Sequence, residues 1–263
     1  MTQKYNKSSN IEGFISASPS PSEKELRKLY ANYYYQNPKN SSYQVEYDEL
    51  ETSYKELECN KLIYALDEAK EPSGKTFLDL GSGEGFLLNA ADKKDLKVTG
   101  LDYSSFGMEK FFPHLISHTI VGDIYESLEM LIAQGKRFSM CASTNVLEHV
   151  LEPTGFINNV YERLNDEGYL IVNIPCLDYL PIHNGNASLF HDGHVNFFSI
   201  NVLSTLLEWQ NFKIVRKIYS TEYNHIYRPK KDKAYVCIIC KKEPKTEHND
   251  LKNQIFVSES QAF

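Results

Sequence analysis

Apolar positions along this chain recur with two different periods from residue 76 onward. Short apolar runs, typical of buried strands, are expected at 76–80, 96–101, 117–121, 138–143, 168–174, 212–219 and 234–240. Apolar positions at helical spacing predict helices at 85–94, 104–112, 123–134, 153–164 and 199–210. Strands that alternate with helices in this way predict an α/β fold with an open, mainly parallel sheet covered by helices on both faces.

The first 75 residues follow a different pattern. Residues 1–19 are rich in Ser and Asn and are expected to be mobile. Ser20-Pro21-Ser22-Glu23 is typical of a capping box with proline at the first helical position, and a second helical pattern covers 46–70. We therefore expect a helical cap at 20–75, a core at 76–241 with a long loop at 175–198, and a polar tail at 242–263.

Three glycines at alternate positions separate the first core strand from its helix. Asp79 lies inside the strand, and Gly81, Gly83 and Gly85 form the turn. Glycine permits the unusual turn angles and lets a ligand approach the backbone. Phe86 stands where the dinucleotide fingerprint has its third glycine, so the pattern is D-x-G-x-G-x-G. A glycine triplet alone is weak evidence for a cofactor site.

Two acidic residues follow at later strand ends. Asp102 comes about 20 residues after the turn, where a second parallel strand delivers a carboxylate that can accept from both hydroxyls of a ribose. Asp102 could also cap the helix that starts near Ser104, and the two roles are compatible. Asp123 follows a third strand in Ile120-Val121-Gly122-Asp123-Ile124.

In this order, the three motifs resemble those of the class I S-adenosylmethionine (SAM) dependent methyltransferases over roughly residues 76–240. The resemblance implies a Rossmann-like sheet of seven strands with the last antiparallel, SAM as cofactor and S-adenosylhomocysteine (SAH) as product. It implies that Asp102 holds the ribose and that Asp123 accepts from the adenine amine, with Tyr103 over the ring. The other cofactor-binding candidates that it implies are Asp79, Gly81, Ser82, Gly83, Gly85, Gly122, Ile124 and Asn145.

Methyl transfer is an in-line displacement, so the protein mainly has to align the reacting atoms. A hydroxyl acceptor also needs a base, and histidine has the suitable pKa range. His149 ends the segment that resembles the family's fourth motif, while His191 and His194 lie at the end of the long loop. These three histidines are the catalytic candidates, and each could instead be structural.

Two patterns could indicate a metal ion. Glu148-His149 resembles a pair in the ubiquinone-pathway O-methyltransferases, but Asn145 stands where those enzymes have a further glutamate, so we expect no metal there. Cys237 and Cys240 form a C-x-x-C inside a strand-like run, in which residues three apart point to opposite faces. We expect them to be buried thiols.

The loop at 175–198 offers many hydrogen-bonding side chains and no continuous apolar wall. This favours O-methylation of a small polar metabolite, and a wider resemblance suggests a sugar nucleotide used for bacterial surface or capsular polysaccharide. An N-methyltransferase, a methyltransferase of another phosphorylated metabolite, and a non-catalytic SAM-binding subunit remain alternatives.

Composition limits the partners. The chain has 263 residues, 41% of them apolar, and a net charge of −7, which does not favour nucleic acid or anionic membranes. We see no apolar segment of transmembrane length and no signal-peptide pattern at the start. We expect a cytoplasmic enzyme, a monomer or a homodimer, with a small-molecule acceptor as its partner.

Overall fold

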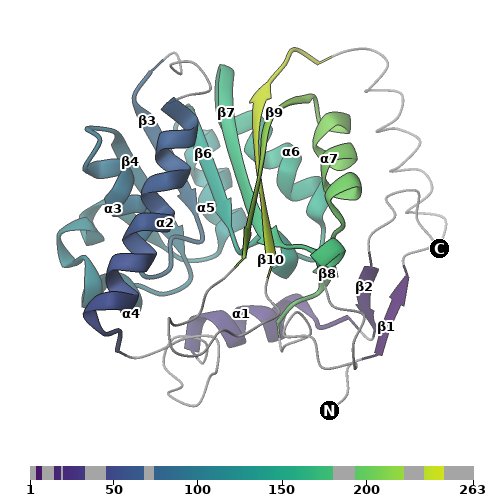
Figure 1. Cartoon of the computed structure of the whole chain (residues 1–263), viewed down its shortest axis with the longest axis horizontal. Helices are drawn as coiled ribbons and strands as arrows, with labels where there is room; N and C mark the ends of the chain where they lie inside the picture. The colour runs from purple at the N-terminus through teal and green to yellow at the C-terminus, as the bar shows by residue number, and fades with distance from the viewer. Residues whose placement is uncertain are drawn as a thin grey trace.

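The computed structural model describes residues 4–7, 15–18, 20–32, 46–67, 74–179, 193–221 and 234–245. Its main feature is a seven-stranded sheet with helices on both faces (Figure 1). The strands are β3 (Thr76–Leu80), β4 (Lys97–Asp102), β5 (Thr119–Val121), β6 (Phe138–Thr144), β7 (Leu164–Pro175), β9 (Phe212–Thr221) and β10 (Ala234–Lys242). Their order is β5-β4-β3-β6-β7-β10-β9.

The pairing of the strands confirms the expected topology. β3 pairs in parallel with β4 and β6, and β6 pairs in parallel with β7. β10, the last strand in the chain, is antiparallel to both β7 and β9. The strand order reverses at β3, so β4 lies on one side of it and β6 on the other, and the carboxyl ends of these three strands meet at the switch point where open sheets bind ligands.

Helices of the core cover both faces of the sheet. The core helices are α3 (Phe86–Asp92), α4 (Phe106–Phe111), α5 (Ile124–Ala133), α6 (Pro153–Arg163) and α7 (Ile200–Trp209). Short 3-10 turns lie at η1 (Pro113–His118), η2 (Leu147–His149) and η3 (Leu177–Tyr179). All five core helices overlap the predicted ranges, and most boundaries differ by one or two residues.

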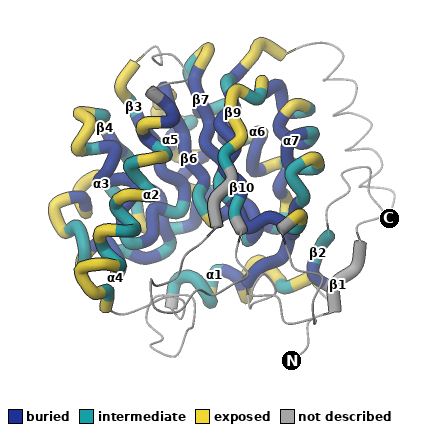
Figure 2. The backbone as a smooth tube through the Cα atoms, in the orientation of Figure 1, coloured by how far each residue is buried: buried dark blue, intermediate teal, exposed yellow. Residues whose placement is uncertain are grey.

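Successive side chains of a strand point to opposite faces of the sheet, so the apolar core has two parts, one on each face. Leu78 and Cys141 pack with α5, α6 and α7 on one face, whereas Phe77 and Met140 pack with α3 and α4 on the other. Figure 2 shows the interior strands buried and the outer sides of the helices exposed. Each fully buried side chain of this size stabilises the fold by about 1.5–3 kcal/mol.

The N-terminal region contributes α1 (Glu23–Asn32) and α2 (Glu49–Asp67). α2 packs on the face covered by α3, through Ile63 and Leu66, and α1 lies across one end of the sheet (Figure 1). The capping box differs from the predicted one. Ser22 and Glu25 form it, with the Glu25 amide 3.3 Å from Ser22 Oγ and the Ser22 amide 2.8 Å from Glu25 Oε2, so Pro21 precedes the cap.

Two short strands occupy part of the segment that was expected to be mobile. β1 (Lys4–Lys7) pairs with β2 (Ile15–Ser18), which pairs with β8 (Asn196–Phe197) from the far end of the long loop. Ala17 is buried against Leu26 and Val195. The rest of the long loop at 180–192, with His191, and the tail at 246–263 lie outside the described residues. Among the described helices, none is long and apolar enough to cross a membrane.

Candidate functional site

A cavity of about 640 Å³ lies at the carboxyl ends of β3, β4 and β6, between the sheet and the two N-terminal helices. Its walls include the glycine turn, Asp79, Asp102, Tyr103, Ile124, Asn145 and His149. From α1 and α2 come Glu23, Leu26, Tyr30, Tyr54, Lys55, Glu58, Cys59 and Leu62. The structure therefore brings most of the predicted cofactor residues to one cavity.

The glycine turn is fixed to the neighbouring strand. The amides of Gly81 and Ser82 donate to the Leu101 carbonyl at 2.8 and 2.9 Å. Gly81 and Gly85 have φ values of 72° and 89°, which other residues rarely adopt. A Cβ at Gly81 would lie 2.4 Å from Val146 Cγ2, and one at Gly85 would lie 2.4 Å from Met108 Sδ. Both positions therefore require glycine, and the turn presents bare backbone to the cavity.

Asp102 connects this turn to the end of β4. Its Oδ2 accepts from the Gly83 amide at 2.8 Å, and its Oδ1 accepts from the Ser104 amide at 3.0 Å. Burial raises the pKa of Asp102 to about 6, against the lowering effect of these backbone donors. Because each carboxylate oxygen has more than one lone-pair site, the local bonds leave capacity for two ribose hydroxyls.

Asp79 supplies the clearest evidence that the cavity suits a cation. It is 1% exposed, and its Oδ1 has no hydrogen-bond partner within the described part of the chain. The same holds for Ser82 Oγ. Burial, with a smaller effect from Asp102, raises the pKa of Asp79 to about 7. A buried carboxyl without a donor is costly, and the ammonium group of SAM would provide that donor.

Only part of the predicted adenine segment lines the cavity. Ile124 lines the cavity, but neither Gly122 nor Asp123 belongs to the lining. Asp123 caps α5, accepting from the Tyr125 and Glu126 amides, and it also accepts from the Tyr103 hydroxyl at 2.6 Å. The adenine contact of Asp123 stays a prediction, as do the other assigned cofactor contacts.

Arg27 on α1 joins this segment and was not identified from the sequence. Its Nε lies 3.2 Å from Asp123 Oδ2, and its Nη1 lies 2.9 Å from Glu126 Oε1. Asp123 is 3% exposed, so this ion pair fixes α1 beside the expected adenine position. A single Arg among the charged residues of a helix gives no local sequence signal.

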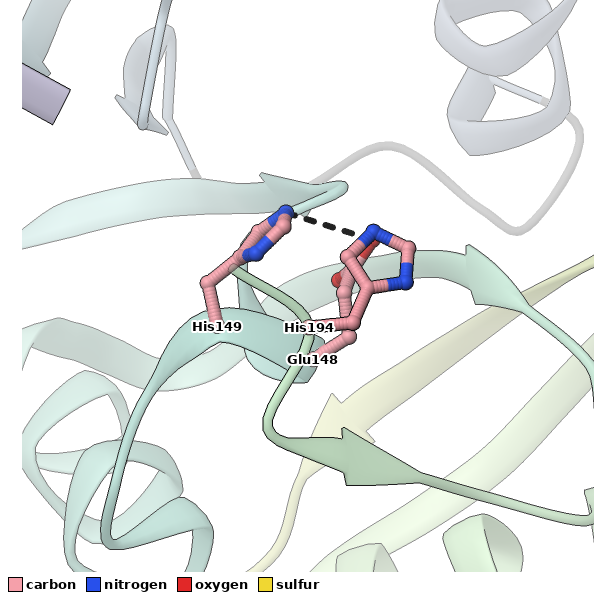
Figure 3. Close-up of side chains that lie close together, drawn as sticks. All are labelled: Glu148, His149 and His194. Carbon is pink, nitrogen blue, oxygen red and sulfur yellow. Dashed lines mark ion pairs between the residues drawn. The ribbon is translucent and has the colours of Figure 1, made fainter. Parts of the chain in front are cut away.

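The two described histidine candidates, His149 and His194, lie in contact with each other. His149 lines the cavity from η2, and the buried His194 packs against it with ring centroids 4.6 Å apart. Glu148 lies beside both rings (Figure 3), with its Oε1 3.8 Å from His149 Nε2. Burial raises the pKa of Glu148 to about 8, so its carboxyl is mostly protonated at neutral pH. His191 lies outside the described residues.

Metal binding was not expected from the sequence. One ligand atom each from Glu148, His149 and His194 lies within 4.8 Å of the others, a spacing at which a metal ion could be held.

Cys237 packs on one face of the sheet and Cys240 on the other, and burial raises the pKa of both thiols. The expectation that these are buried thiols on opposite faces is confirmed.

Comparison with known proteins identifies the family. A family profile described as "Methyltransferase domain" matches residues 52–217. A ubiquinone biosynthesis O-methyltransferase from Chelativorans sp. (strain BNC1) is 30% identical over 105 residues, 40% of this chain and 42% of that protein. One from Pasteurella multocida (strain Pm70) is 25% identical over 121 residues, 42% of this chain and half of that protein. The chain thus matches half or less of each relative's length.

Solved structures support the same fold. Magnesium protoporphyrin IX methyltransferase from Synechocystis PCC 6803 with bound SAH aligns with a TM-score of 0.59 at 14% identity, covering 84% of this chain and all of that one. A SAM-dependent methyltransferase from Archaeoglobus fulgidus aligns with a TM-score of 0.55 at 17% identity, covering 72% of this chain and 94% of that one. With the profile match over most of the core and a cavity suited to a cationic adenosyl ligand, the chain belongs to the methyltransferase-domain family, as a class I SAM-dependent methyltransferase.

Proposed function

We propose that this methyltransferase transfers the methyl group of SAM to a hydroxyl of a small aromatic acceptor, with His149 as the base. The observation that carries the proposal is the placement of His149 on the wall of the same cavity as Asp79, Asp102 and the glycine turn. The methyl donor would be held by these groups, and the acceptor would bind beside His149, Asn145 and the aromatic residues of the cap, which line the same cavity.

A hydroxyl acceptor fits a histidine base. The proton of a phenol has a pKa near 10, which is within reach of an imidazole of pKa about 6.5 when the oxygen attacks in the same step. Nδ1 of His149 is within hydrogen-bond distance of Tyr30 Oη and the Gly193 carbonyl, at 2.6 and 2.8 Å. Nε2, which lies 3.8 Å from Glu148 Oε1, is the ring nitrogen to which we assign the acceptor proton.

The charge of the cavity argues against a sugar nucleotide, the acceptor first expected. Its described lining carries six carboxyl side chains, Glu23, Glu58, Asp79, Glu84, Asp102 and Glu152, and one Lys or Arg, Lys55. Lys55 is already 2.9 Å from Glu84 Oε2. A diphosphate brought beside these carboxylates would be repelled, whereas a sulfonium would be attracted.

The remaining lining is largely aromatic and aliphatic. It includes Leu26, Tyr30, Tyr47, Tyr54, Phe86, Tyr125, Leu151 and Tyr235. Such walls suit a flat, weakly charged ring. The names of the similar ubiquinone biosynthesis O-methyltransferases support transfer to oxygen and specify no acceptor for this chain.

Incubation with SAM carrying a ¹³C-labelled methyl group tests the proposal. The acceptors are catechol, a primary aromatic amine, and UDP-glucose, and the product is identified by the chemical shift of its labelled methyl. We expect a methyl ether from catechol alone. His149→Gln should lower turnover by about 100-fold or more, while His118→Gln, an exposed position on η1, should keep it. Methylation of UDP-glucose or of the amine in preference to catechol would contradict the proposal.

A further inference from the structure

We infer that Lys55 on α2 binds the carboxylate of SAM, while Asp79 accepts from the ammonium group of the same methionyl end. Lys55 would then fix the cofactor from the N-terminal cap, outside the glycine turn and the acidic motifs. Neither those motifs nor the comparisons assign this role. The inference concerns the cofactor alone, so it holds for any acceptor and does not depend on His149 as the base.

The chemistry of the cofactor requires such a partner. The methionyl end of SAM carries a carboxylate beside its ammonium group, and a carboxylate taken out of water needs a cation or several donors. The described lining of the cavity has six carboxyl groups, which repel an anion. Lys55 is the one Lys or Arg of that described lining, so it is the cation that the structure offers.

The spacing along α2 directs Lys55 toward the cavity. Residues three or four positions apart lie on one face of a helix. Those at this spacing that line the cavity are Lys55, Glu58, Cys59 and Leu62. Burial raises the pKa of the Cys59 thiol to about 12, and smaller effects come from Asp79, which raises it, and Lys55, which lowers it. Both charges therefore lie near this thiol on the cavity wall.

Contacts on the cavity wall hold the ammonium group of Lys55. Its Nζ lies 2.9 Å from Oε2 of Glu84, a residue of the glycine turn. It also lies 4.4 Å from the ring centroid of Tyr47 and 5.4 Å from that of Phe86, distances at which an aromatic face attracts a cation. The cation is thus held in place before the cofactor binds, which limits the entropy lost on binding.

The ion pair with Glu84 leaves Lys55 able to bind a second carboxylate. An ammonium group has three N–H donors, and Glu84 accepts from one of them. Glu84 also accepts from the Tyr47 hydroxyl, so two donors offset its charge. Once Lys55 holds the SAM carboxylate, the described lining has no second Lys or Arg for a phosphate of the acceptor. This agrees with the aromatic acceptor proposed above.

Calorimetric titration with SAM and with decarboxylated SAM tests the inference. Decarboxylated SAM keeps the adenosine, the sulfonium and the ammonium group and lacks only the carboxylate. Wild type should bind it about 10- to 100-fold more weakly than SAM. Lys55→Met should weaken SAM binding by the same factor and leave the Kd of decarboxylated SAM within about threefold of wild type. Lys55→Arg, which keeps the charge, should retain a preference for SAM.

Lys93→Met is the matched control, because Lys93 also joins α2 to the core, with its Nζ 3.4 Å from Glu56 Oε1, and lies outside the described lining. It should leave both Kd values at the wild-type level. If Lys55→Met weakened both ligands equally, or neither, the inference would be overturned, since a lysine that only docks α2 affects them alike. Equal affinity of wild type for the two ligands would overturn it without any variant. Because binding is measured without acceptor, failure to methylate catechol would contradict the proposed function alone.

Discussion

The replacement Asp79→Asn should stabilise the free protein while weakening the cofactor complex. Asp79 is buried, its Oδ1 has no partner in the described chain, and burial raises its pKa from 3.8 to about 7. At a pH between 3.8 and about 7, Asp79 keeps its proton in the folded protein and has lost it in the unfolded chain. The free energy of unfolding therefore falls as the pH rises through this window, and the full cost is present above pH 7.

The size of this effect follows from the pKa difference. Roughly three units at about 1.4 kcal/mol each give a cost of about 4 kcal/mol above pH 7, as an upper value. Asparagine avoids this cost, so the variant should melt roughly 10 °C higher at pH 8, with the difference disappearing below pH 4. Loss of the carboxylate partner for the SAM ammonium should cost about 2–5 kcal/mol of binding, which is roughly 30-fold or more in Kd.

Thermal unfolding at pH 4 and pH 8, followed by calorimetric titration with SAH at pH 8, measures both effects. Asp166→Asn, at an exposed position, serves as the control and should change neither. A variant that melts lower than wild type at pH 8, or that binds SAH as tightly, would refute the reasoning. The first result would mean that Asp79 has a stabilising partner, and the second that the ammonium binds elsewhere.

Three further predictions concern the turn, the cap and the metal. Gly85→Ala should lower stability by about 1–3 kcal/mol in urea unfolding, because φ is 89° and Met108 occupies the space of the new Cβ; a loss below about 0.5 kcal/mol would contradict this. Arg27→Ala should speed hydrogen exchange along α1 and leave the core strands protected, since it releases the ion pair with Asp123; unchanged protection of α1 would count against the docking role. Dialysis against EDTA should leave turnover unchanged, because the proposed proton transfer to His149 needs no metal ion; a loss restored by a divalent cation would assign Glu148, His149 and His194 to a metal ion instead.

Local sequence signals were sufficient for the core of the fold and for one side of the cavity. The apolar runs predicted every strand of the main sheet, because its central strands are largely buried; the edge strands β5 and β9 are partly exposed. The glycine spacing and Asp102 were equally readable, since both follow directly from strand ends. These features depend on neighbours within about 20 residues along the chain.

The other side of the cavity depends on contacts between distant segments. Tyr30 reaches His149 across 119 residues, and Arg27 reaches Glu126 across 99. Neither partner is marked by a local pattern. The capping serine was misassigned, because Ser20 and Ser22 each stand three residues before a glutamate and only the structure shows that Ser22 forms the cap. The strand Ile15–Ser18 was also missed, because it pairs with β8, about 180 residues further along the chain.

The acceptor prediction was drawn from a loop whose residues 180–192 lie outside the described chain. The polar residues of that loop favoured a hydroxylated metabolite. The described lining adds what the loop sequence could not provide, namely six carboxyl groups, one lysine and many aromatic rings around the same cavity. Charge and wall composition follow from tertiary packing, so they changed the proposed acceptor and left the cofactor assignment intact.

A crystal structure of the protein with SAH tests the central claim most directly. The cavity at the ends of β3, β4 and β6 should hold the nucleoside, with both ribose hydroxyls on the Asp102 carboxylate and the amino group within hydrogen-bond distance of Asp79 Oδ1. SAH bound elsewhere, or seated in this cavity without contact to either carboxylate, would contradict the account.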